Sequence, residues 1–171
     1  MFQCMILAIT AVMVGLDQLT KWLSVMYLRN GDAVTVIPGV LDFSYTENSG
    51  AAFSILSDER WFLVVITMIV MIALGAFVLF GQFRHYKLFN LSATLILAGG
   101  IGNLIDRLLL GYVVDFLKVT FMDFPIFNVA DCFVVVGSVL LLIFFCFVYE
   151  DKKASTTEDA NGTVSDDSSG G

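Results

Sequence analysis

Four long runs of apolar residues dominate the chain and predict four membrane-spanning helices, at about residues 2–28, 61–80, 88–110 and 125–149. Each run is long enough to cross the hydrocarbon core of a bilayer at about 1.5 Å per residue. The first run lacks the basic start and the small-residue cleavage site of a secretory signal peptide, so we expect it to be a retained helix. Four crossings place both ends of the chain on the same side of the membrane.

The stretch between the first two apolar runs follows a different pattern. Apolar and polar residues alternate with a period of two on both sides of Pro38 and Gly39. This alternation is typical of strand, turn and strand, and it predicts a small extramembrane β element at about residues 30–58. The polar residues at its end, around Asn48 and Gly50, have two interpretations: a simple turn, or a loop that receives a peptide by strand addition.

Composition supports a small polytopic membrane protein rather than a soluble domain. The chain is 58% hydrophobic, with a mean hydropathy of +0.86. Of its formal net charge of -7, the residues from Glu150 onward contribute six acidic side chains and two lysines. Residues 151–171 are rich in Ser, Thr, Asp and Gly, which predicts a disordered acidic tail. No basic patch is present that could neutralise a phosphate backbone, so we expect no nucleic-acid partner.

Cysteine and histidine positions do not indicate a metal site. Cys4, Cys132 and Cys146 lie in apolar helical segments without the spacing of metal ligands, which favours a role in packing. His85 lies in a short connector far from them in sequence. We therefore expect neither a metal nor a Ser-His centre.

Residues 99–131 combine apolar sequence with many polar and charged side chains. These are Asn103, Asp106, Arg107, Asp115, Lys118, Asp123, Asn128 and Asp131. Hydrocarbon cannot solvate charge, so such side chains usually face a protein interior or a wet cavity and are candidates for function. We expect the functional site here.

Helical spacing groups several of these residues. Asn103, Asp106 and Arg107 share one face of the third predicted helix, and Asn128 and Asp131 share one face of the fourth. Counted from Pro125, Asp131 is expected about 9 Å below the start of that helix. Asp115 is expected in the link after the third helix, leaning over the same point.

The first helix carries its own charged pair. Asp17 and Lys21 are four residues apart and therefore lie on one face, in the order that favours an ion pair. Two roles stay open for this pair: a buried contact that fixes helix packing, or a direct part of the site.

Two facing carboxyl groups, Asp115 and Asp131, have a clear chemical use. In a partly dry site each negative charge disfavours the other, so the pair tends to share one proton and to titrate as a unit. One group can then act as general base on a water while the other acts as general acid. An alternative is a proton-coupled transporter with Asp106, Asp115 and Asp131 as a relay, and a further one is a scaffold in which the aspartates form packing ion pairs.

Five sequence blocks resemble one family. DQLTK (17–21), ENSGAAF (47–53), GGIGNLIDR (99–107), VVDF (113–116) and FNVAD (127–131) are similar, in order, to the motifs of bacterial lipoprotein signal peptidase, or signal peptidase II. The resemblance implies an aspartyl protease with four transmembrane helices and a periplasmic β cradle, forming one domain over residues 1–150. Such an enzyme cuts prolipoproteins before the cysteine that carries diacylglycerol.

The resemblance also implies roles for individual residues. Asp115 and Asp131 correspond to the catalytic pair. The other matched positions are expected to bind substrate (Asn48, Asn103, Arg107 and Asn128) or to support the site (Asp17, Lys21, Gly50, Asp106 and Ala130). It further implies no cofactor, a diacylglyceryl-modified prolipoprotein substrate, contact with membrane lipids and a monomer. We expect location in the bacterial inner membrane, with the active site near the periplasmic face.

Basic residues indicate orientation only weakly. Four of them flank the predicted helices on each side of the membrane. If Arg107 and Lys118 are held in a site rather than free in loops, the remaining balance favours cytoplasmic termini.

Overall fold

The computed structural model describes residues 2–50, 60–81, 83 and 85–149, and these form four helical segments and a three-stranded sheet. In chain order the elements are α1 (Phe2–Leu28), β1 (Val34–Ile37), β2 (Leu41–Asn48), α2 (Arg60–Phe80), α3 (Lys87–Leu109), β3 (Val113–Val119), α4 (Val129–Ile143) and the π-helical turns η2 (Phe144–Tyr149). All four helical segments are long and apolar enough to cross a membrane. The prediction of four spans with a small β element is confirmed.

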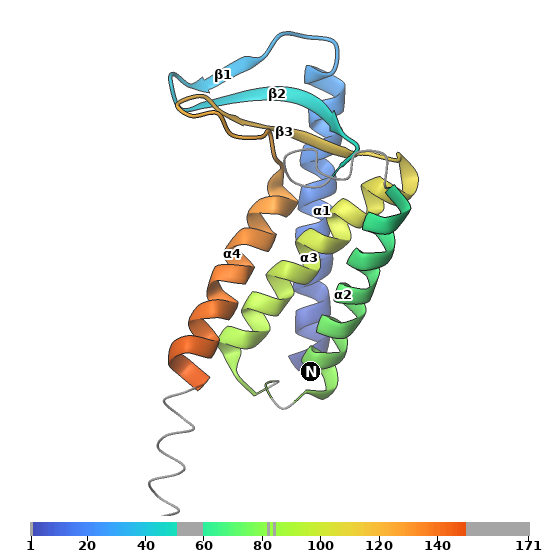
Figure 1. Ribbon diagram of the computed structural model, residues 1–171, viewed down its shortest axis with the longest axis vertical. Helices are drawn as coiled ribbons and strands as arrows, with labels where there is room; N and C mark the ends of the chain where they lie inside the picture. The colour runs from blue at the N-terminus through green and yellow to red at the C-terminus, as the bar shows by residue number, and fades with distance from the viewer. Residues whose placement is uncertain (1, 51–59, 82, 84, 150–171) are drawn as a thin grey trace, which may run out of the picture.

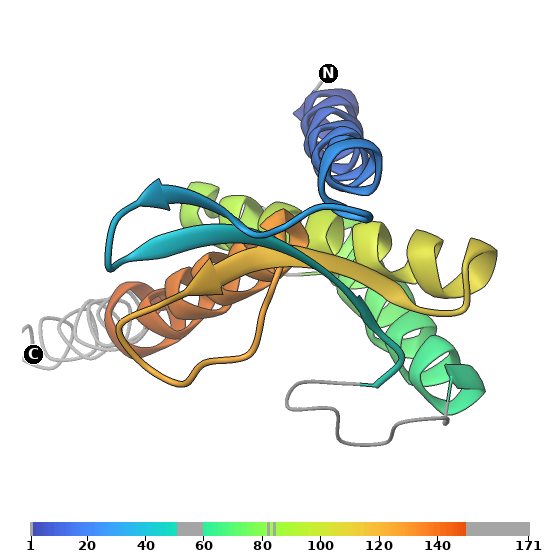
Figure 2. The same ribbon diagram turned by 90° about the horizontal axis from the view of Figure 1, so that it is seen from above.

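Helix α3 is the centre of the bundle. It packs against α1, α2 and α4, and it is the most buried of the four spans. The start of α1 and the end of α4 lie at one end of the bundle, and the sheet lies at the other (Figure 1). Seen from above, the sheet lies over the ends of α3 and α4 (Figure 2).

Three glycines allow the helices around α3 to approach it closely. A Cβ on Gly99 would collide with the carbonyl oxygen of Ala130, and one on Gly102 would collide with the Asp17 carboxylate. Gly100 faces the Met71 side chain in the same way. This close approach brings α1 and the first turn of α4 to the same level of α3.

The sheet is antiparallel with the order β1, β2, β3. Gly39 has a φ of 73°, which glycine adopts without steric cost, and it forms the predicted turn between β1 and β2. Strand β3 was not predicted, since residues 113–119 were expected to be a plain link. Its first four residues are all buried. A strand without a solvent-facing side shows no alternation of polar and apolar residues.

Helix α4 begins at Val129, so the expected start near Pro125 is wrong. Phe127 instead pairs with Leu117 of β3, with its N–H donating over 3.1 Å and its carbonyl oxygen accepting over 2.8 Å. Asn128 then caps the helix. Asp131 therefore lies in the first turn of α4 and not about 9 Å along it.

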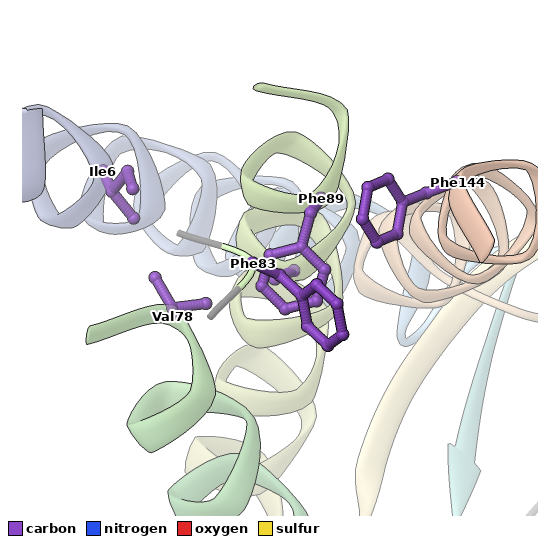
Figure 3. Close-up of a cluster of buried hydrophobic side chains, with 6 residues drawn as sticks. Ile6, Val78, Phe83, Phe89 and Phe144 are labelled. Carbon is purple, nitrogen blue, oxygen red and sulfur yellow. The ribbon is translucent and has the colours of Figure 1, made fainter. Parts of the chain in front are cut away.

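The end of the bundle opposite the sheet has an aromatic core. Ile6, Val78, Phe83, Phe89 and Phe144 come together from α1, α2, α3, η2 and the connector between α2 and α3 (Figure 3). Phe83 and Phe144 make an edge-to-face contact with ring centroids 5.7 Å apart. The predicted disordered tail and the loop residues 51–53 lie outside the described residues.

Gly137 of α4 provides a test of the packing between α3 and α4. A Cβ there would meet Ile96 Cγ1 and the Ser92 carbonyl oxygen, both at 2.8 Å. We expect Gly137→Ala to lower the unfolding temperature in detergent, since overpacking typically costs about 1–3 kcal/mol. Gly75→Ala on α2 is the matched control, because nothing lies within 4 Å of its Cβ. Equal unfolding temperatures for the two variants would show that this contact is not tight.

Candidate functional site

Asp115 and Asp131 line the same cavity. Asp115 is the third residue of β3, and its side chain is only 1% exposed. Asp131 is in the first turn of α4 and is partly exposed. The cavity has a volume of about 520 Å³ and also contacts Asn48, Asn103 and Arg107. The structure thus brings together the candidate acids that the sequence separates by a strand and a loop.

Asn128 connects the two elements that carry the acids. Its Nδ2 donates to Asp115 Oδ1 over 2.6 Å and to Asn103 Oδ1 over 3.1 Å. Its Oδ1 accepts from the backbone N–H of Asp131 over 3.0 Å, and Asp131 Oδ2 accepts from the Asn128 N–H over 3.2 Å. This reciprocal cap fixes the start of α4. Asn128 is fully buried and uses both polar atoms of its amide.

Asn103 completes the connection between the acids. Its Nδ2 donates to Asp131 Oδ1 over 2.8 Å, while its Oδ1 accepts from Asn128 and from Lys21 Nζ, the latter over 2.8 Å. Two amide side chains therefore bridge from Asp115 to Asp131.

The end of β2 forms the other side of the site. Asn48 Nδ2 donates to Asp115 Oδ2 over 2.9 Å, and Asn48 Oδ1 accepts from the Gly50 N–H over 3.0 Å. Arg107 Nη2 donates to the Gly50 carbonyl oxygen over 3.2 Å. Arg107 Nε is buried and has no hydrogen-bond partner among the described residues. Arg107 also lines the cavity, beside Asn48 and the two acids.

Asp17, Lys21 and Asp106 lie behind the cavity and do not line it. Lys21 Nζ is 3.0 Å from Asp17 Oδ2 and 3.0 Å from Asp106 Oδ2, and all three side chains are at least 97% buried. The predicted ion pair on α1 is confirmed, with Asp106 as a second partner. Asp17 Oδ1 accepts from the Ala130 N–H over 2.9 Å, so the pair both packs the helices and reaches the residue before Asp131.

Sequence reasoning missed several residues around the site. Gln18 Nε2 donates to the Gly102 carbonyl oxygen over 3.1 Å and to Asp106 Oδ1 over 3.0 Å. The position of Gln18 next to Asp17 in the sequence could have indicated that it lies near the site. The apolar wall of the cavity gave no signal, because its residues look like ordinary helix and loop positions: Phe124, Pro125, Ile126, Phe127, Val134, Val135 and Val136.

Burial raises the pKa of Asp115 from 3.8 to about 6, and the charge of Asp131 acts in the same direction. The hydrogen bonds from Asn48 and Asn128 and the charge of Lys21 oppose this increase. Loss of hydration is the larger effect because the carboxyl group is almost fully enclosed. Asp115 is therefore suited to retain a proton at a pH where an exposed aspartate would have lost it.

Among the described residues, no group of three or more His, Cys, Asp or Glu side chains could hold a metal ion. Of the free cysteines, Cys132 lies on the cavity wall, whereas Cys4 and Cys146 are exposed on the helices.

Comparisons with known proteins indicate the family of the chain. A family model described as "Signal peptidase (SPase) II" matches residues 9–147. A lipoprotein signal peptidase from Streptococcus pyogenes serotype M2 is 47% identical over 133 residues, which cover 77% of this chain and 86% of that protein. One from Enterococcus faecalis is 42% identical over 91% of this chain and 93% of its own length. A solved structure described as a bacterial membrane enzyme aligns with a TM-score of 0.77 at 35% identity, covering 87% of this chain and 90% of its own.

The pKa of Asp115 predicts a pH dependence of stability. The folded state holds this proton more tightly than the unfolded state, so the contribution to stability is greatest below about pH 4 and is lost as the pH rises through about 6. Two pKa units correspond to about 3 kcal/mol at most. We expect the unfolding temperature of the wild type, relative to Asp115→Asn, to fall between pH 4 and 7 in detergent. A difference that stays constant over this range would contradict the assignment.

Proposed function

Since this chain belongs to the signal peptidase II family, we propose that Asp115 and Asp131 are the two catalytic groups with which it hydrolyses prolipoproteins. The chain is a multi-pass bacterial membrane protein and a protease that removes signal peptides from prolipoproteins. The aspartic mechanism is our inference. The observation that carries it is the pair of carboxyl groups on one cavity, bridged by Asn128 and Asn103.

The different surroundings of Asp115 and Asp131 suit them to different roles in proton transfer. Asp115 is the more buried of the two, and burial raises its pKa to about 6, so it holds a proton more readily than an exposed aspartate does. Asp131 lies in the first turn of α4, where the helix dipole and the Asn128 N–H stabilise negative charge. We therefore assign the general acid to Asp115 and the general base to Asp131.

Hydrolysis then proceeds without a covalent intermediate. Asp131 takes a proton from a water whose oxygen attacks the peptide carbonyl carbon, and Asp115 donates its proton to the carbonyl oxygen. The resulting diol collapses when Asp131 passes its proton to the leaving nitrogen and the C–N bond breaks. Asp115 takes back a proton from the diol, so both groups return to their initial states.

Substrate position follows from the polar and apolar halves of the cavity. Asn48, Asn103 and Arg107 line the cavity beside the acids and supply the polar contacts for a peptide backbone there. Below the acids the wall is apolar and continues to Val135 and Val136, which are 62% and 50% exposed on α4. A diacylglyceryl cysteine can stay in the bilayer there while the bond before it reaches the acids, provided that the cavity opens laterally to lipid.

We assign the sheet and the acids to the periplasmic side of the inner membrane and both termini to the cytoplasm, in a monomer that needs no cofactor. The sheet lies at the opposite end of the bundle from the start of α1 and the end of α4 (Figure 1). The transporter alternative is not favoured, because the matched relatives are named as peptidases.

Cleavage assays on two acid variants test the proposal. We expect Asp115→Asn and Asp131→Asn each to lose at least about 10³-fold in kcat, since the acid and the base each lack a substitute. The assay uses purified protein in detergent and a diacylglyceryl-modified prolipoprotein, and product is measured by mass spectrometry.

Asp32→Asn is the matched control, because Asp32 is an exposed carboxylate outside the cavity. It should cleave at the wild-type rate. Near wild-type cleavage by either site variant would rule out the catalytic pair.

A further inference from the structure

The two candidate acids share a feature in the residue before each of them. The N–H of Val114, which precedes Asp115, donates to Asp106 Oδ2 over 3.1 Å. The N–H of Ala130, which precedes Asp131, donates to Asp17 Oδ1 over 2.9 Å. In both cases the backbone N–H of the residue before the acid donates to a buried carboxylate on a different element: Asp106 on α3 or Asp17 on α1. A backbone contact at this position fixes where the next side chain begins.

One ammonium group joins both of these carboxylates. Lys21 Nζ lies 3.0 Å from Asp17 Oδ2 and 3.0 Å from Asp106 Oδ2, and it donates to Asn103 Oδ1 over 2.8 Å. Its three hydrogens thus have three acceptors. Lys21 is only 3% exposed, so water cannot take the place of any of them.

The third contact of Lys21 determines which way the Asn103 amide points. An ammonium group can only donate, so the atom that faces it must be the amide oxygen. The NH₂ group is then left facing Asp131 Oδ1, at 2.8 Å. If the amide turned over, its oxygen would face the Asp131 carboxylate and its NH₂ would face Lys21, and both contacts would be repulsive.

We propose that Lys21 is a positioning residue for the proteolysis proposed above, on which this inference rests. Its single ammonium group sets the place of Asp115 through Asp106 and of Asp131 through Asp17, and it sets the donor that faces Asp131 through Asn103. Lys21 does not line the cavity, so we expect it to make no contact with a substrate bound there. A purely structural Lys21 would change the stability of the enzyme and leave the kinetics of its folded fraction unchanged.

Lys21→Met, which keeps most of the length of the side chain and removes the charge, separates these two roles. We expect its kcat to fall about 10- to 100-fold with KM unchanged, since a displacement of about 1 Å at a reacting group can cost 10²-fold. The pH dependence of kcat should also shift to higher pH, because the charge of Lys21 lowers the pKa of Asp115. Arg107 and Asp131 also face Asp115 across the cavity, and both are unchanged in this variant.

Conservative and control variants complete the experiment. Lys21→Arg keeps the charge and should recover part of kcat. Phe144→Ala removes a fully buried ring at the far end of the bundle, so it should lower the unfolding temperature and leave kcat unchanged. All assays are run below the lowest unfolding temperature. If Lys21→Met does not fold, Asp106→Asn is used, which weakens one arm of the same network and should also lower kcat at constant KM.

The outcomes are distinguishable. Wild-type kcat and an unshifted pH profile in folded Lys21→Met, or in folded Asp106→Asn where it is used, would overturn the positioning role. The same assay includes the wild type and Asp131→Asn. If Asp131→Asn cleaves normally, the proposed function fails and not the role of Lys21 alone.

Discussion

Three charged side chains are held inside a dry, apolar helix bundle, and the contacts that keep them there organise the candidate site. Asp17, Lys21 and Asp106 are almost fully buried, and removing an ion from water costs several kcal/mol even after relaxation. The structure offsets this cost by giving every charged group several partners. Gln18 and two backbone N–H groups supply donors to the two carboxylates that share a single ammonium group. The same contacts that make these charges tolerable also place the candidate acids.

Glycines on α3 make this network possible. Gly99 lets the first turn of α4 lie against α3, and Gly102 leaves room for the Asp17 carboxylate. A larger residue at either position would push α4 or α1 outward. The carboxylates would then be separated from the N–H groups that donate hydrogen bonds to them. The buried carboxylates can therefore reach their hydrogen-bond donors only because the helices pack closely at this level of the bundle.

Much of the fold could be predicted from the sequence because membrane spans carry a strong signal. The uncharged run before Phe80 predicts α2, and the turn at Pro38 and Gly39 predicts the β1–β2 hairpin. Both signals lie within the segment that they specify. Helical spacing also predicted that Asn103 and Asp106 share a face. Strand β3 could not be predicted, because it is buried and does not alternate. The start of α4 could not be read from Pro125, because the pairing of Phe127 with β3 depends on tertiary contact.

The candidate site, too, could be predicted only in part from the sequence. Its candidate residues were proposed from five sequence blocks, but the links between the blocks are side-chain contacts between residues far apart in sequence. Lys21 and Asn103 are 82 residues apart, and Asn48 and Asp115 are 67 apart. Spacing within a helix indicates which groups share a face. It does not indicate which distant groups will complete their hydrogen bonds.

We propose that Asp115 and Asp131 share one proton, and the pH dependence of kcat/KM for the wild-type enzyme is the decisive measurement. This ratio reports the ionisation of the free enzyme. We expect a bell-shaped profile with a slope of about one on each side, because one acid must be ionised and the other protonated. A profile that rises and stays flat toward alkaline pH would mean that no protonated acid is required, and it would rule out the shared proton.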